Sequence, residues 1–125
     1  MHVAPRTVLL VEDDLSLRRA IRGVLERAGY AVVDAGSGMH ALQLARALPE
    51  GIGLLVTDLE LPGMAGWEVA DALAGLQPQI ETLFISGNVP ALVRAHERRP
   101  RTTAYLAKPF DASVFLETVR MLLAR

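Results

Sequence analysis

Five short apolar runs alternate along the chain with segments in which apolar residues recur at helical spacing. The runs lie at residues 7–11, 30–33, 53–57, 80–85 and 103–107. Helices are expected at about 15–28, 37–48, 66–76, 90–98 and 111–124. Short apolar strands that alternate with amphipathic helices predict a parallel sheet covered by helices on both faces.

Five strand–helix units with right-handed crossovers favour a flavodoxin-like sheet with strand order 2-1-3-4-5. A closed barrel would need about eight units. We therefore expect one α/β domain of the (βα)5 class over residues 1–125, with its core at about 7–124 and no output domain. Asp14 and Asp111 are the expected N-caps of the first and last helices, and Gly29 is expected to end the first helix.

The composition excludes several classes of protein. The 125 residues are 51% hydrophobic, which suits a folded domain with a single core. A net charge of −1 gives no electrostatic basis for binding nucleic acid or a membrane surface. The absence of cysteine excludes disulfides and thiolate metal sites. No apolar stretch approaches the roughly 20 residues of a membrane span, so we expect a cytoplasmic protein without nucleic-acid or membrane partners.

The residues that follow four of the apolar runs could form a site together. Glu12 and Asp13 follow the first run, Asp58 the third and Ser86 the fourth, whereas Lys108 follows the fifth and is the only lysine. Open parallel sheets bind ligands beyond the carboxyl ends of their strands, at the point where the strand order reverses. The first and third strands flank that point, so Asp13 and Asp58 are expected to face each other.

Three crowded carboxylates repel one another unless a proton or a cation intervenes. The ligands are hard oxygens, which favour Mg²⁺, or alternatively Mn²⁺, over zinc. Mg²⁺ retains several waters and bridges carboxylates to phosphate, while a lysine and a hydroxyl can contact phosphoryl oxygens. The pattern indicates that Asp58 is a nucleophile that forms an aspartyl phosphate.

These motifs together resemble the receiver domains of two-component response regulators. The resemblance covers nearly all of residues 7–124. It rests on residues 9–14 (LLVEDD), 56–66 (VTDLELPGMAG), 84–87 (FISG) and 105–110 (YLAKPF). Four motifs in this order, each at the end of a predicted strand, are highly specific.

The resemblance implies a role for each matching residue. Asp58 would be the phosphoacceptor and, with Asp13, a metal ligand. Glu12 would reach the metal directly or through water, and the backbone carbonyl of Glu60 would be a further ligand. Asp14 matches no ligand position and is assigned to helix capping.

The resemblance also implies a conformational switch. Ser86 would contact the phosphoryl group and move on activation, and Tyr105 would change rotamer as Ser86 moves. Lys108 would pair with the phosphoryl group and precede a cis bond to Pro109. The implied protein is a signalling domain rather than an enzyme. A histidine kinase or histidine phosphotransfer protein would phosphorylate it, and a downstream protein would bind the face formed by residues 90–98, 103–107 and 111–124.

Departures from the commonest pattern are few. Glu12 in place of Asp and Ser86 in place of Thr are usual variants of the family. The segment 96–104 lacks the Gly-Ala pair that many receivers carry there, and is similar to receivers attached to hybrid sensor kinases. Both a stand-alone regulator and a domain of a hybrid kinase fit the sequence.

Other interpretations stay open. An interaction module that works without phosphorylation would lack one of the key residues, and none is missing. A phosphatase would begin with an Asp-x-Asp motif, and a flavodoxin would not place acids in its phosphate loop. Several side chains have a plainer alternative to a functional role, as half-buried, packing or surface groups: Tyr105, Trp67, His40, His96 and the arginines at 98, 99 and 101.

Overall fold

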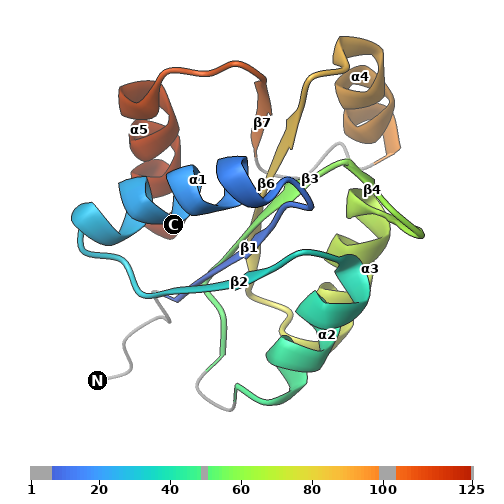
Figure 1. Cartoon of the computed structure of the whole chain (residues 1–125). Helices are drawn as coiled ribbons and strands as arrows, with labels where there is room; N and C mark the ends of the chain where they lie inside the picture. The colour runs from blue at the N-terminus through green and yellow to red at the C-terminus, as the bar shows by residue number, and fades with distance from the viewer. Residues whose placement is uncertain (1–6, 49–50, 99–103, 125) are drawn as a thin grey trace.

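The structure, a computed structural model, describes residues 7–48, 51–98 and 104–124. A parallel five-stranded sheet forms its centre, with spatial order β2-β1-β3-β6-β7 (Figure 1). The strands are β1 Val8–Val11, β2 Val32–Ala35, β3 Leu54–Asp58, β6 Glu81–Ser86 and β7 Ala104–Ala107. Numbered by their succession in the chain, these five strands have the order 2-1-3-4-5, which confirms the prediction.

Helices cover both faces of the sheet (Figure 1). Their bounds are α1 Leu15–Arg27, α2 Gly38–Arg46, α3 Gly66–Leu76, α4 Val89–Arg98 and α5 Ala112–Leu123. One apolar cluster joins the sheet to α1 and α5, and a second joins it to α2, α3 and α4. The expected doubly covered α/β architecture is therefore confirmed.

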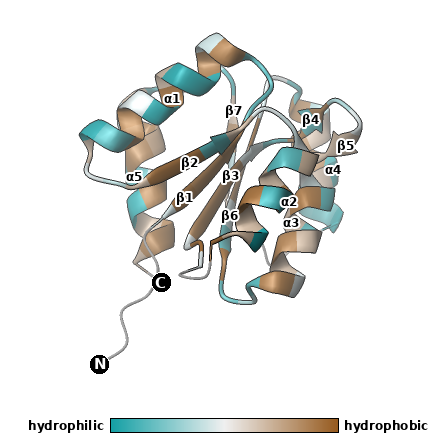
Figure 2. Ribbon diagram, turned by 60° about the horizontal axis from the view of Figure 1, so that its bottom comes forward, coloured by the Kyte–Doolittle hydropathy of each residue, from teal (hydrophilic) through white to brown (hydrophobic). Residues whose placement is uncertain are grey.

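Alternation along the strands divides the core into these two clusters. In β1, Val8 and Leu10 face α1 and α5, whereas Leu9 and Val11 face the other three helices. Successive side chains of a strand point to opposite faces, so a strand covered on both sides must be apolar throughout. Figure 2 shows the result as hydrophobic strands between helices whose polar surfaces face outward.

The helix ends follow the expected chemistry. Asp14 accepts a hydrogen bond from the Leu17 amide at 3.0 Å, and Asp111 accepts one from the Ser113 amide at 2.8 Å. Gly29 follows α1 with a φ of 96°, a left-handed conformation that glycine adopts without a steric penalty. The chain is thereby turned back toward β2.

The second strand lies two residues later than predicted. The amide of Tyr30 still bonds to the carbonyl of Leu25, so the helix exit extends into the apolar run. Pairing then starts with Val8 opposite Val32 and ends with Val11 opposite Ala35. The register with β1, rather than the apolar run itself, sets the bounds of this strand.

A small hairpin, which is not among the elements expected from the sequence, follows β3. Its strands are β4 Glu60–Leu61 and β5 Met64–Ala65, paired antiparallel. Gly63 occupies the turn with a φ of 75°. The hairpin leads directly into α3, and an added Cβ at Gly66 would lie 2.2 Å from the backbone oxygen of Asp58. The start of α3 therefore lies so close to the backbone of Asp58 that only glycine fits at this position.

Among the described residues, no helix combines the length and apolarity that a membrane crossing demands. Arg99 and Arg101, two of the three neighbouring arginines named in the sequence analysis, lie outside the described residues. Arg98 is the last residue of α4.

Candidate functional site

Three acidic side chains meet at the carboxyl ends of β1 and β3. Glu12 and Asp13 directly follow β1, and Asp58 is the last residue of β3. One carboxylate oxygen of each lies within 4.8 Å of the others, a grouping that could hold a metal ion. Glu12 and Asp58 are buried, at 1% and 7% exposure, whereas Asp13 is exposed. The cluster is therefore open to solvent on the side of Asp13.

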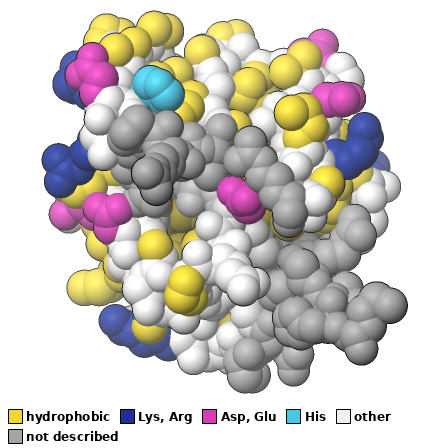
Figure 3. Space-filling view, turned by 180° about the vertical axis from the view of Figure 1, so that it is seen from behind, with side chains coloured by type: hydrophobic (Ala, Val, Ile, Leu, Met, Phe, Trp, Pro, Cys, Tyr) yellow, Lys and Arg dark blue, Asp and Glu magenta, His cyan; other side chains and the backbone are white. Residues whose placement is uncertain are grey.

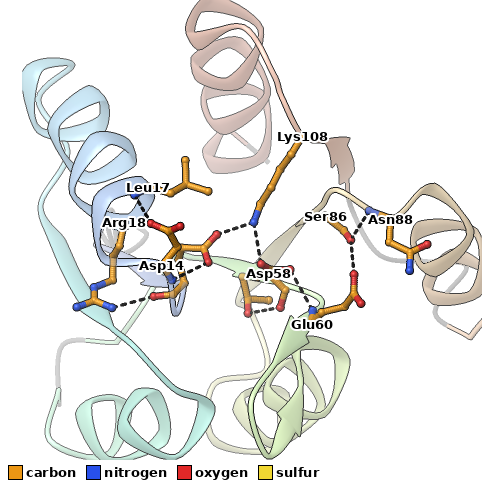
Figure 4. Close-up of polar contacts among 10 residues, drawn as sticks. Asp14, Leu17, Arg18, Asp58, Glu60, Ser86, Asn88 and Lys108 are labelled. Atoms are coloured by element: carbon orange, nitrogen blue, oxygen red, sulfur yellow. Dashed lines mark hydrogen bonds and ion pairs between the residues drawn. The ribbon is translucent and has the colours of Figure 1, made fainter.

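Lys108 joins two of these acids. Its Nζ donates to Oε1 of Glu12 and to Oδ2 of Asp58, at 2.7 Å in each case (Figure 4). The Lys108–Pro109 bond is cis, as predicted. The amide of Lys108 donates to the carbonyl of Ser86 at 2.8 Å, which anchors the end of β7 to the end of β6. The ammonium group therefore comes from the far end of the chain into the acidic cluster.

The charges of the cluster are only partly balanced. One lysine facing three ionised carboxylates leaves a formal charge of −2. Burial raises the pKa of Glu12, although the hydrogen bond and the charge of Lys108 oppose that rise. Burial alone would lower the pKa of Lys108, but its hydrogen bonds with Asp58 and Glu12 outweigh burial and raise it. Lys108 thus stays cationic, while the buried Glu12 carboxylate is held at an electrostatic cost.

Ser86 and Glu60 form the other side of the site. Ser86 ends β6 and is fully buried. Its Oγ donates to Oε1 of Glu60 at 3.3 Å and accepts from the amide of Asn88 at 3.0 Å (Figure 4). The amide of Glu60 donates to Oδ1 of Asp58 at 3.0 Å. Both carboxylate oxygens of Asp58 are therefore hydrogen-bonded, one to a backbone amide and one to Lys108.

The contact between Ser86 and the Glu60 side chain is a feature that sequence reasoning missed. The predicted role of Glu60 involved only its backbone carbonyl. The Glu60 side chain lies on the exposed side of the short β4 strand, and its carboxylate accepts a hydrogen bond from Ser86. The only sequence signal for this contact is that Glu60 lies two residues after Asp58.

Tyr105 lies on β7 beneath α4, away from the acidic cluster. Its ring is half-buried, 5.6 Å from the Phe84 ring, and contacts the His96 ring edge-on at 5.4 Å. Its hydroxyl donates to the carbonyl of Ala95 at 3.5 Å. A tyrosine that contacts both β6 and α4 is placed to sense movement between them, and its role as a switch stays a prediction.

The other singled-out side chains lie apart from the acids. His40 is exposed in the first turn of α2, and His96 packs against Tyr105. Trp67 is partly buried against the core, as the packing interpretation predicts. The guanidinium of Arg98 lies over its ring, 3.5 Å from the centroid.

Comparison with known proteins decides the family. A family model described as the response regulator receiver domain matches residues 8–120. The chain belongs to this family. It is 31% identical over 118 residues to the response regulator receiver protein CpdR of Brucella abortus, which covers 94% of this chain and 97% of CpdR. Among solved structures, the chemotaxis regulator CheY4 of Vibrio cholerae superposes with a TM-score of 0.83 at 26% identity, covering 95% of this chain and 99% of that one.

Receiver domains also occur inside longer relatives. The chain is 30% identical over 119 residues to the sensor kinase CckA of Brucella abortus, covering 95% of this chain but 13% of CckA. It likewise spans 48% of nodulation protein W of Bradyrhizobium diazoefficiens. The fold and the family predicted from the sequence are therefore confirmed. The protein is a receiver domain of two-component systems, a class of signalling domain that interacts with histidine kinases.

Proposed function

We propose that this receiver domain accepts a phosphoryl group on Asp58 from a histidine kinase or a histidine phosphotransfer protein, in a reaction that requires Mg²⁺. The observation that carries the proposal is the double contact of Lys108 with Asp58 and Glu12, beside an exposed Asp13. A buried acceptor carboxylate thus has a cation on one side and an acidic, solvent-open face on the other.

The donor set suits a hard divalent cation. The acids carry a formal charge of −2 after pairing with Lys108, and all their donor atoms are oxygens. Asp13, Asp58 and Glu12 would hold Mg²⁺, or alternatively Mn²⁺, with the Glu60 carbonyl as a further ligand. When bound, the ion would offset the charge that gathers on the phosphoryl oxygens in the transition state.

The residues of the chain supply the rest of the chemistry. A carboxylate oxygen of Asp58 forms a bond to phosphorus while the P–N bond of the donor phosphohistidine breaks. The departing imidazole takes up a proton. Lys108 already donates to Asp58 at 2.7 Å and would transfer this hydrogen bond to a phosphoryl oxygen. Ser86 would leave Glu60 and donate to another phosphoryl oxygen.

The movement of Ser86 would then alter the surface around α4, β7 and α5. Tyr105 links β6 to α4 and would change rotamer as Ser86 moves. The two helices beside β7 expose apolar side chains to a partner protein, namely Val89, Val93, Val114 and Met121. On the face seen in Figure 3, acidic and basic side chains are interspersed, which suits a protein partner better than nucleic acid.

The test is covalent labelling with acetyl phosphate and Mg²⁺, followed by mass spectrometry of the intact chain. The unmodified protein should gain the mass of one phosphoryl group, and Asp58→Asn should gain none. Asp14→Asn is the matched control, because Asp14 is a neighbouring acid that caps α1, and asparagine caps a helix equally well. Equal labelling of Asp58→Asn and the unmodified chain would refute the assignment of the acceptor.

A further inference from the structure

Arg18 connects the acidic cluster to the edge of the sheet. It lies in the first turn of α1, and its side chain is 18% exposed. Its Nη1 donates to the backbone carbonyl of Glu12 at 2.9 Å (Figure 4). Its Nε donates to Oδ2 of Asp34, also at 2.9 Å. One guanidinium thus bonds simultaneously to the chain just after β1 and to a carboxylate on β2.

The surroundings of Arg18 hold its guanidinium in one orientation. Asp34 also pairs with Arg22, one turn further along α1, so two arginines share one carboxylate. Gly36 leaves room for the group, since an added Cβ there would lie 2.8 Å from Nη1 of Arg18. The planar fork of arginine makes both hydrogen bonds from one rigid group, which a lysine ammonium on its flexible stem cannot reproduce.

The bonded carbonyl belongs to the peptide that joins two of the acids. The amide of Glu12 still pairs with Ala35 of β2, but the β1 strand ends at Val11. The Glu12 carbonyl therefore obtains its partner from Arg18. A peptide unit is planar, so a fixed carbonyl also fixes the orientation of the bonds that lead to the Asp13 side chain.

We propose that Arg18 is a positioning residue for the metal-binding acids. It holds the Glu12–Asp13 peptide so that the carboxylates of both residues converge on Asp58. Residues that orient metal ligands typically affect affinity by about 10-fold to 100-fold, even though they never touch the ion. The inference rests on the proposed function, because it concerns the affinity of the same acids for Mg²⁺.

Replacing Arg18 removes both a positive charge and a support of the Glu12–Asp13 peptide, and these two losses change the affinity for Mg²⁺ in opposite directions. A cation beside an acidic cluster disfavours a second cation, so removing its charge alone would strengthen Mg²⁺ binding. Removing the hydrogen bond that supports the Glu12–Asp13 peptide would weaken Mg²⁺ binding. The sign of the change in Mg²⁺ affinity of Arg18→Met therefore separates the two effects.

The experiment is titration calorimetry of Mg²⁺ into the full chain and its variants. Arg18→Met should raise the dissociation constant by about tenfold, and Arg18→Lys should give an intermediate value. Arg19→Met is the matched control, because Arg19 is the next residue of α1, exposed and of equal charge. It should leave the affinity unchanged or slightly raise it.

A second variant keeps the proposal testable if Arg18→Met does not fold, as judged by circular dichroism without metal. Arg18→Lys serves as that variant, because it retains the positive charge but not the planar fork, so weaker Mg²⁺ binding cannot come from a change of charge. Unchanged or tighter binding in the folded Arg18 variants, or equal weakening in Arg19→Met, overturns the positioning role while the proposed function stands. No Mg²⁺ binding by the unmodified chain overturns both.

Discussion

Replacing Lys108 with methionine removes the cation that pairs with both buried carboxylates, those of Glu12 and Asp58. Methionine keeps the length of the side chain but cannot donate to Glu12 or Asp58. Both acceptors are poorly hydrated, with side-chain exposures of 1% and 10%. The variant therefore leaves two carboxylates close together, without the group that balanced their charge.

Removing one partner of a buried ion pair typically destabilises a protein by about 3–5 kcal/mol. Lys108 is 22% exposed, and a carboxyl group can relieve the repulsion by binding a proton. We therefore expect the free energy of unfolding to fall by about 2–3 kcal/mol at pH 7 without metal.

The loss of stability should depend on pH in a defined direction. Burial already raises the pKa of Glu12 above its ordinary value of 4.5, and Lys108 counteracts this rise. Without Lys108 the pKa rises further, so above pH 4.5 the folded variant binds more protons than its unfolded state. Stability that depends on such a proton falls as pH rises. The difference in the free energy of unfolding between the unmodified chain and Lys108→Met should therefore be small near pH 4.5 and grow toward pH 7. For one proton it grows by at most about 1.4 kcal/mol per pH unit.

The assay is urea unfolding in EDTA between pH 4.5 and 7.5, followed by the fluorescence of the single tryptophan, Trp67, and by circular dichroism. Lys108→Arg retains a cation at the site, and Arg19→Met removes an exposed one. The latter should change stability by no more than about 0.5 kcal/mol. A loss below that value for Lys108→Met at pH 7, or a loss independent of pH, would refute the reasoning.

Two further predictions concern the metal and the turn after β3. Mg²⁺ at about 100 times its dissociation constant should stabilise the fold by about 2.7 kcal/mol, which raises the thermal midpoint by roughly 10 °C in a chain of this length. Scanning calorimetry checks this, and an unchanged midpoint at saturating Mg²⁺ would contradict the proposed site. Gly66→Ala should destabilise the protein by about 2–4 kcal/mol in urea unfolding, because its Cβ would overlap the Asp58 carbonyl. Gly75→Ala on the same helix has open space and should be neutral or stabilising, so an equal loss in both variants would exclude the overlap as the cause.

Much of the fold could be predicted because its determinants are local. The third helix has the bounds 66–76 that the sequence predicts, and Asp14 and Asp111 cap the helices where they were expected. Caps and apolar periodicity depend on residues within a few positions of one another, so they can be recognised without tertiary contacts. The second strand lies two residues from its expected place because pairing with β1 set its register.

The candidate site also has features that the sequence predicts and features that it does not. The sequence by itself determined which groups gather there, since the carboxyl ends of parallel strands share one edge of the sheet. Only the tertiary structure decided how they pair. Lys108 meets Glu12 across 96 positions, Ser86 turns to Glu60, and Arg18 bonds to the Glu12 carbonyl. Such pairings depend on the packing of strands and helices distant in sequence, whereas the carboxyl ends of β1, β3, β6 and β7 follow from the local apolar pattern of the chain.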